Sequence, residues 1–452
     1  MSLAVNKAKR PQSARPRFAS LERAIWALPA LGIASVALQV AGAAAQIDDA
    51  VRVNVALILT QGAVFLLAVA AASRGATIGL GYMLVVAALL RATLLFLPPY
   101  HSSDIYRYVW DGWVQAAGVN PYLYIPDDPA LARLRDVSIW PNINRADYAP
   151  TIYPPAAQMI FFLITRIPAG VIGMKIGWIA FECVTAWAVI RLLDHLRLPR
   201  ARLLIYAWSP LVVWEVAGSG HLDAAMATFL ILAVLASLRD RHGIAGVAMG
   251  LAVLVKFFPL VALPALWRRW DWKLPTAFLT VIAVGYTLYL GAGLKVFGFL
   301  SGYSQEEGLR DGSGFWFVYA FRFLTGFTLP AILYVATVAL LLGCLALFVV
   351  TSRDSAKPMS GALLLAATGM IALSPGHPWY FVWLMPLLCF APSLPVLWVT
   401  VVSPLLYWPN AYSVSWSSDV LYGGFCVLAF GQLVVRFRHQ AIGILEKHHD
   451  AH

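Results

Sequence analysis

Long apolar runs recur along the chain from Ala24 to Val435 and alternate with short polar segments. A helix of about 20 apolar residues crosses a hydrocarbon core of about 30 Å. Runs of that length, or nearly so, occupy residues 24–46, 53–73, 76–98, 173–193, 203–217, 221–238, 274–293, 329–351, 359–375, 378–392, 394–410 and 418–435. The pattern therefore predicts an all-α polytopic membrane protein, a bundle of about 12–14 transmembrane helices.

Two apolar stretches do not fit a simple crossing, because basic residues mark the cytoplasmic side of a membrane protein. If Pro154–Arg166 crossed, the arginines that follow the next span would lie outside, so we expect a juxtamembrane helix along the outer surface. The stretch 243–267 has basic residues at both ends and Lys256, followed by Pro259, at its middle. We expect two short helices there, with Lys256 near their outer tip, since short or broken helices often flank membrane sites.

The composition supports this interpretation. Of the 452 residues, 60% are apolar and only 12% are charged, about half the charged share of a soluble globular protein. These values exclude a soluble enzyme, a secreted disulfide scaffold and a disordered chain. The net charge of +11 lies mostly in short segments between apolar runs. That distribution favours contact with anionic membrane lipid on the cytoplasmic face and argues against nucleic acid as a partner.

The charge pattern divides the chain into a basic cytoplasmic tail over 1–23, one membrane domain over 24–438 and a second cytoplasmic tail over 439–452. We expect both termini in the cytoplasm and the protein in a bacterial-type inner membrane. Residues 99–170 then form a large outer loop with juxtamembrane helices, and residues 294–327 form a second outer loop. Ala43–Ala45 could pass for a signal-peptidase site, but the long basic segment before it favours an uncleaved first helix.

The first outer loop opens with polar and aromatic residues around Asp104. On a helix, Asp104, Arg107, Tyr108 and Asp111 share one polar face, as an interfacial helix requires. A carboxylate at the membrane boundary can accept the proton of a substrate hydroxyl, so Asp104 is a candidate general base. It could instead favour the helix N-terminus electrostatically and pair with Arg107. The second carboxylate, of Asp111, leaves the choice of base open.

Other outer segments carry candidate substrate-binding residues. Tyr153 and Gln158 could face a sugar ring, or could belong to a loop scaffold at the membrane interface. Glu215, His221 and Asp223 lie at the outer ends of two spans, where ionisable residues are costly and therefore candidates for function. On one helix His221 and Asp223 would point about 160° apart, and Asp223 could simply be a first-turn acid. Their spacing is a weak metal signal, and the four cysteines show no metal-ligand spacing.

Three cations are candidates for binding a phosphate. Lys256 and Arg91 lie within apolar runs, and His377 lies in an outer turn. A fixed cation stabilises the charge left on a departing phosphate, so each could hold a lipid-linked donor. Alternatively, Lys256 could extend to lipid headgroups, and Glu182 could neutralise one of the cations. The aromatic residues after His377 could simply lie exposed at the membrane interface.

The order of these motifs resembles that in glycosyltransferases with the GT-C fold. The likeness is greatest to the polyprenyl-phosphate-sugar-dependent mannosyltransferases of glycosyltransferase family 87. It runs from about Arg91 to Tyr380 and rests on Ser103-Asp104-Ile-Tyr-Arg-Tyr108, Asn120-Pro-Tyr122, Tyr153-Pro-Pro155, Gly220-His-Leu-Asp223, Lys256 with a following proline, and His377-Pro-Trp-Tyr380. The family's catalytic loop usually follows the first span, whereas here it follows the third. An added N-terminal hairpin would account for this difference and keep the orientation.

The resemblance implies a GT-C-like helical bundle. It also implies an inverting transfer of a sugar, usually mannose, from a polyprenyl phosphate to a lipid or glycan acceptor on the non-cytoplasmic face. Asp104 would be the base, and Lys256, His377 and Arg91 would hold the donor phosphate. The substrate-binding candidates are Tyr106, Arg107, Asp111, Tyr153, Gln158, Glu215, His221, Asp223, Trp379 and Tyr380. No metal ligands are assigned, and a divalent cation is left open as a cofactor.

A transporter or flippase of polyprenyl-linked glycans is the main alternative, because it too needs polar groups among many spans. Transporters commonly show inverted repeats, with charged groups near the middle of the membrane. In this chain the polar residues concentrate on one side and no repeat is visible. The pattern therefore favours an enzyme over a transporter, and over a third interpretation, a structural subunit of a cell-envelope complex.

Overall fold

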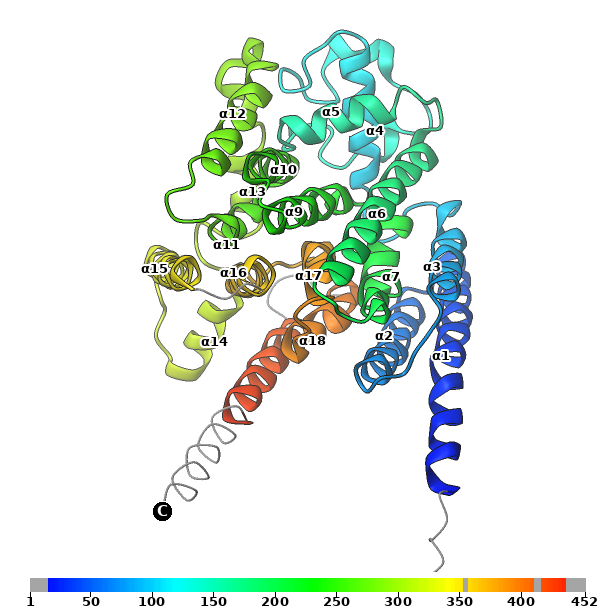
Figure 1. Cartoon of the computed structure of the whole chain (residues 1–452). Helices are drawn as coiled ribbons and strands as arrows, with labels where there is room; N and C mark the ends of the chain where they lie inside the picture. Colours follow the sequence, from blue (N-terminus) through cyan, green and yellow to red (C-terminus); the bar gives the residue numbers. More distant parts are fainter. Residues whose placement is uncertain (1–14, 353–356, 410–415, 436–452) are drawn as a thin grey trace, which may run out of the picture.

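The computed structural model describes residues 15–352, 357–409 and 416–435. Over these ranges all regular structure is helical and no strand is formed, which confirms the predicted all-α class. Figure 1 shows long and short helices together, with the free ends of α1 (Arg15–Ile47) and of the last described helix pointing toward the bottom of the view. The expected tail 439–452 and most of the tail 1–23 lie outside the described residues.

Five helices are long and apolar enough to cross a membrane: Ala27–Ile47 within α1, α2 (Val51–Ser73), α6 (Gly170–His195), α15 (Ala331–Thr351) and Trp416–Val435. A sixth is gained if Lys273–Thr287 and Leu290–Glu306, which meet at 110°, count as one bent span. Shorter apolar helices follow many of the other expected spans. The chain is thus a multi-pass helical membrane protein, with fewer full-length helices over the described ranges than the expected 12–14.

Several of the shorter helices begin at or next to a proline. The expected span 203–217 divides into α7 (Leu204–Ala207), α8 (Pro210–Val212) and the π-helix η4 (Val213–Gly218). Pro210 begins a helix because it lacks the N–H that a helix interior would need. Apart from the elements described in the next paragraphs, the other helices are α3 (Leu80–Leu95), η3 (Arg200–Leu203), α12 (Lys273–Thr287), α16 (Lys357–Leu373), η7 (Pro378–Leu384), α17 (Met385–Leu388), α18 (Leu394–Val402), η8 (Ser403–Tyr407), α19 (Trp416–Ser418) and η9 (Asp419–Gly423).

The stretch 243–267 is broken at its middle, as predicted. Helix α10 (His242–Val255) ends at Lys256, whose φ of −153° and ψ of 142° are extended. The 3-10 helix η5 (Phe258–Ala262) and α11 (Leu263–Leu266) follow, beginning around Pro259. Helix α9 (Asp223–Leu238) packs along α10. The break therefore brings the Lys256 side chain to the start of α9.

The segment expected to form the first outer loop contains α4 (Asp104–Ala116), the 3-10 helices η1 (Pro129–Leu134) and η2 (Trp140–Asn142), and α5 (Pro155–Ile164). Helix α5 is too short to span a membrane, which fits the expected juxtamembrane helix. Helix α4 packs against α5 and α6 and buries both its polar and its apolar side, including Arg107, Asp111 and Val109. The expected amphipathic surface helix is therefore wrong for α4, because its charged residues pair with one another inside the protein.

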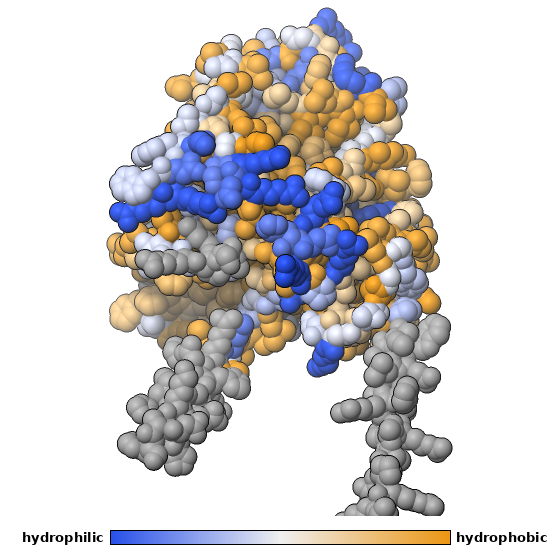
Figure 2. All heavy atoms as spheres, viewed as in Figure 1, coloured by the Kyte–Doolittle hydropathy of each residue, from blue (hydrophilic) through white to orange (hydrophobic). Residues whose placement is uncertain are grey.

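The second outer loop contains η6 (Leu290–Phe297), α13 (Leu300–Glu306) and α14 (Trp316–Thr325). It packs directly on the first loop at Gly298, where an added Cβ would overlap the carbonyl oxygen of Thr151. Figure 2 shows a largely hydrophobic surface crossed by a hydrophilic band. Helix α15 exposes large apolar residues such as Ile332, Leu340 and Phe348, as expected of a helix in contact with hydrocarbon.

Candidate functional site

Asp104 is the first residue of α4, directly after the third helix and its two prolines. Its backbone N–H donates to Ser102 Oγ at 3.2 Å, and Asn144 Nδ2 donates to its carboxylate oxygen Oδ1 at 2.8 Å. The other oxygen, Oδ2, has no hydrogen bond within the described ranges. The expected pairing with Arg107 is wrong, because Arg107 bonds elsewhere. Asp104 is therefore a half-buried carboxylate with one oxygen held and one available to accept a proton.

The second carboxylate of α4, Asp111, is fully occupied. Arg107 Nε donates to Oδ1 at 2.9 Å, while Thr151 Oγ1 and Gln158 Nε2 donate to Oδ2 at 2.5 and 2.9 Å. Arg107 also donates to the carbonyl of Ala149 at 3.1 Å. This buried network ties α4 to α5 and to the segment between them. Its geometry favours a structural role for Arg107, Asp111 and Gln158, and leaves Asp104 as the better candidate base.

Lys256 forms a two-point ion pair with Asp223. Its ammonium lies 2.9 and 2.8 Å from the two carboxylate oxygens, and 4.8 Å from the centroid of the Tyr380 ring. Asp223 is fully buried, whereas the Lys256 side chain keeps 15% of its surface exposed. The alternative in which Lys256 extends to lipid headgroups is therefore wrong. It is a fixed cation, held at the break after α10 by the first residue of α9.

Trp379 lies between two histidines. Its ring stacks on His221 on one side and on His377 on the other, with centroids 4.2 Å apart in both cases. Trp379 is consequently buried, which corrects the expectation that it lies exposed at the interface. The three rings, hereafter the Trp379 stack, join the turn before α9 to the turn after α16.

Glu215 lies at the buried side of this stack. Tyr407 donates from its hydroxyl to both carboxylate oxygens at 3.0 and 2.9 Å, and His221 Nε2 lies 3.4 Å from Glu215 Oε2. His221 precedes α9 and Asp223 begins it. Because His221 is outside the helix, the two residues are free of the helical spacing that would separate them. His221 turns to Glu215, and Asp223 turns to Lys256.

These segments meet near Asp104. Asp104 is close enough to interact electrostatically with His377, Tyr380, Tyr407 and Asp223. Burial lowers the pKa of His377, against the opposite effects of the Glu307 and Asp104 carboxylates. Burial thus favours the neutral imidazole, which can form hydrogen bonds, over the cation that the sequence predicts. The structure thus brings together residues from four distant parts of the sequence.

The second outer loop covers this cluster with α13. The hydroxyl groups of Tyr303 and Tyr380 are hydrogen-bonded. Arg145 Nε and Tyr148 Oη both donate to Glu306, at 2.7 and 2.9 Å. Glu307 lies 3.8 Å from His377. Asn144, Arg145, Tyr148, Tyr303, Glu306 and Glu307 were not among the predicted site residues. The adjacent acids Glu306 and Glu307 are the local signal in the sequence that could have indicated them.

Arg91 has a different environment. Its Nε and Nη2 atoms donate to Glu182 at 3.2 and 2.6 Å, and its Nη1 atom donates to the carbonyls of Ala87 and Ala207 at 3.1 and 2.7 Å. Every nitrogen of the guanidinium group therefore has a protein partner, and Glu182 neutralises the charge. We leave Arg91 out of the phosphate site, because four of its five N–H groups are occupied and its charge is already compensated by Glu182.

Two more candidates lie deeper than expected. Tyr153 is buried, its ring edge-on to Tyr108 and Phe161 with centroids 5.0 and 5.5 Å apart. Tyr106 is half-buried against the core. Over the described ranges, no group of three or more histidine, cysteine or acidic side chains is placed to hold a metal ion. The cluster therefore offers a carboxylate, a fixed ammonium and stacked rings.

Comparisons with known proteins give consistent results. Residues 20–271 match a family model described as alpha-(1->6)-mannopyranosyltransferase, N-terminal domain. The alpha-(1->6)-mannopyranosyltransferase A proteins of Mycobacterium tuberculosis and Corynebacterium glutamicum are 27% and 28% identical over 44% and 38% of this chain. The chain spans only 40% and 35% of the length of these relatives. No solved structure matches.

A third relative matches over a longer stretch. The polyprenol-phosphate-mannose-dependent alpha-(1-2)-phosphatidylinositol pentamannoside mannosyltransferase of Mycolicibacterium smegmatis is 26% identical over 330 residues, 68% of this chain and 73% of its own length. All three relatives are named as mannosyltransferases. The family match covers the segments that contain Asp104, Glu215, His221, Asp223 and Lys256.

Proposed function

The chain belongs to the alpha-(1->6)-mannopyranosyltransferase family, and from this premise we propose that it is a membrane mannosyltransferase whose donor is a polyprenyl-phosphate mannose. The donor is supported by the name of the Mycolicibacterium smegmatis relative, a polyprenol-phosphate-mannose-dependent mannosyltransferase. The acceptor is a hydroxyl of a lipid or glycan. Assignment to glycosyltransferase family 87 is compatible with these matches and remains an expectation.

The observation that carries the proposal is the arrangement of Asp104 and Lys256. Asp104, which has one free carboxylate oxygen, interacts electrostatically with Asp223 and Tyr380, and these two residues contact the Lys256 ammonium. A glycosyl transfer needs these two functions on opposite sides of the reacting carbon. A base removes the acceptor proton, and a cation stabilises the phosphate that leaves.

The chemical step follows from these roles. The acceptor oxygen attacks the anomeric carbon of mannose while its proton passes to Asp104. The bond between that carbon and the phosphate oxygen breaks, and its electron pair leaves with the polyprenyl phosphate. Attack opposite the departing phosphate inverts the configuration at the anomeric carbon. Lys256 faces the phosphate, and Asp223 holds the ammonium in place.

The test is transfer by the purified protein in detergent. Polyprenyl-phosphate mannose with a radioactive sugar is incubated with a membrane lipid extract, and labelled lipid or glycan is measured. Wild-type protein is expected to form product, and Asp104→Asn to form it about 10²- to 10⁴-fold more slowly, the usual contribution of a general base. Asp147→Asn is the matched control, because Asp147 is an exposed acid of the same loop. Unchanged transfer by Asp104→Asn would overturn the role of Asp104.

The side of the membrane is part of the proposal. In the sequence, basic residues concentrate at the ends of the apolar runs opposite Asp104, and this distribution supports a non-cytoplasmic position for the first outer loop. A cysteine introduced as Asp147→Cys should react with a membrane-impermeant maleimide in intact spheroplasts. Labelling only after the membrane is opened would place the loop in the cytoplasm and reject this orientation.

A further inference from the structure

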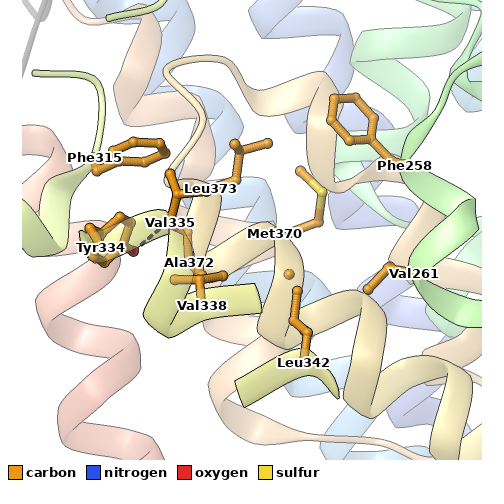
Figure 3. A pocket seen from close by; sticks show the side chains of 11 residues that line it. Phe258, Val261, Phe315, Tyr334, Val335, Val338, Leu342, Met370, Ala372 and Leu373 are labelled. Carbon is orange, nitrogen blue, oxygen red and sulfur yellow. Dashed lines mark hydrogen bonds between the residues drawn. The ribbon is translucent and has the colours of Figure 1, made fainter. Parts of the chain in front are cut away.

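An apolar cavity of about 230 Å³ lies beside the candidate site. Figure 3 shows its walls, which come from η5, the start of α14, α15 and α16. Among the lining residues, the polar side-chain group is the Tyr334 hydroxyl, which donates to the carbonyl of Ala372 at 2.6 Å. Since this hydroxyl already has its partner, the cavity offers a ligand an apolar surface. Its lining residues are Phe258, Val261, Phe315, Tyr334, Val335, Val338, Leu342, Gly369, Met370, Ala372 and Leu373.

One end of the cavity adjoins the cation. Phe258 follows Lys256 by two residues, and its ring lies 5.2 Å, centroid to centroid, from the ring of Tyr380. The Lys256 ammonium lies over the same Tyr380 ring at 4.8 Å. Leu373, at the end of α16, precedes the turn that carries His377. A ligand held by Lys256 could therefore enter the cavity by passing the Tyr380 and Phe258 rings.

The other end runs along α15. Tyr334 and Leu342 are eight positions apart on this helix, which corresponds to a length of about 12 Å. The same helix exposes Leu340 and Leu341 on its surface. An extended chain advances roughly 1.2 Å per bond, so the cavity length suits two to three five-carbon isoprene units. A longer chain would continue along the exposed face of α15 into the bilayer.

We infer that this cavity holds the first isoprene units of the donor, joined to the phosphate that Lys256 binds. The inference rests on the proposed function and adds the position of the lipid chain. An anionic head followed by an uncharged chain matches a cation followed by an apolar cavity. The acceptor lipid is excluded from this position, because its hydroxyl must approach Asp104 from the side opposite the departing phosphate.

Gly369 provides a way to fill the cavity without changing any polar group. A Cβ at this position would meet Val261 at 3.5 Å, an ordinary contact distance. A leucine side chain would extend further into the cavity. Gly343, in the neighbouring helix α15, is exposed, and a Cβ there meets nothing within 4 Å. Both glycines lie inside helices, so the two substitutions change helix propensity equally.

The experiment measures KM for donor and acceptor separately in Gly369→Leu and Gly343→Leu. Filling an apolar pocket changes selectivity by about 10- to 100-fold, so Gly369→Leu should raise the donor KM by that factor and leave the acceptor KM unchanged. Gly343→Leu should leave both within about twofold of the wild type. If Gly369→Leu does not fold, Val338→Phe fills the cavity from the opposite wall with the same expected result.

Binding of sugar-free polyprenyl phosphate separates this inference from the proposed function. The wild-type protein and Gly343→Leu should gain thermal stability from this lipid, and Gly369→Leu should not. That result would support binding of the isoprene units in the cavity even if no mannose were transferred. An unchanged donor KM in a folded cavity variant, or a rise in the acceptor KM alone, would overturn the inference.

Discussion

Two buried ion pairs in this protein differ in what their cations have left to bind. Arg91 uses all three guanidinium nitrogens on Glu182 and on two backbone carbonyls. Lys256 contacts one carboxylate and the face of one ring, at the end of a broken helix. The first pair occupies four of the five guanidinium N–H groups and joins helices α3, α6 and α7. The second lies at a chain break, beside the rings of the candidate site. The place of the cation in the fold, rather than burial, separates a structural cation from a candidate ligand-binding one.

The largest expected effect comes from replacing the second pair. In Lys256→Met combined with Asp223→Leu, no unpaired charge is left buried, so the unfolding free energy should not fall. Transfer should fall roughly 10²- to 10³-fold, the usual loss when one group that stabilises developing negative charge is removed. Product formation and thermal unfolding of the same preparation measure both quantities. Retained transfer in a folded double variant would remove Lys256 from the site.

The pair of Arg91 and Glu182 should affect the stability of the protein and not the rate of transfer. Arg91→Met leaves Glu182 buried without a partner and should cost about 3–5 kcal/mol of unfolding free energy. Adding Glu182→Leu should recover most of that loss. Transfer per folded molecule should stay near the wild-type value in the double variant. A loss of transfer there, at normal stability, would show that Arg91 belongs to the phosphate site after all.

A third prediction concerns pH and the connection between α3 and α4. Burial lowers the pKa of His101 to about 4, and its Nε2 lies 2.8 Å from Asn54 Oδ1. The folded protein binds a proton on His101 less readily than the unfolded chain does. The contribution of His101 to the free energy of unfolding is therefore fully present above pH 6.5. It should fall by about 3 kcal/mol as the pH drops through that value to about 4. His101→Gln keeps a donor to Asn54 and should flatten this part of the curve of unfolding temperature against pH. An unchanged slope would show that protonation of His101 does not cause this loss of stability.

The smallest effect is expected from the contact between the two outer loops. Arg145→Gln removes an ion pair with Glu306 whose side chains are about one-third exposed, and such pairs contribute roughly 0–1 kcal/mol. We expect a change in unfolding temperature near the limit of detection. Protease cleavage in the segment 298–312 should accelerate more than global unfolding does. Equal acceleration of both would mean that α13 does not open independently.

The sequence identified those features whose signals are local. Asp104 follows two prolines at the end of an apolar run, and the break at Lys256 combines a charge with a nearby proline. The short helix α5 was anticipated from the distribution of arginines. These signals act within a few residues, so a single chain reveals them.

Other features depend on which distant residues meet. Glu182 lies 91 positions from Arg91. The sequence indicates that Glu182 could neutralise a cation, but nothing near either residue shows that this cation is Arg91. The burial of α4 depends on α5 and α6, and the Trp379 stack joins two turns that are far apart in sequence. Several apolar runs are also longer than the helices they form, because prolines within them divide the helices.

The most direct test of the central claim is a single-turnover measurement with enzyme in excess over bound donor, started by adding acceptor. If Asp104 accepts the proton, Asp104→Asn should bind the donor with wild-type affinity and transfer mannose about 10²- to 10⁴-fold more slowly, while Asp147→Asn transfers at the wild-type rate. Transfer by Asp104→Asn at the wild-type rate, with the donor fully bound, would contradict the account.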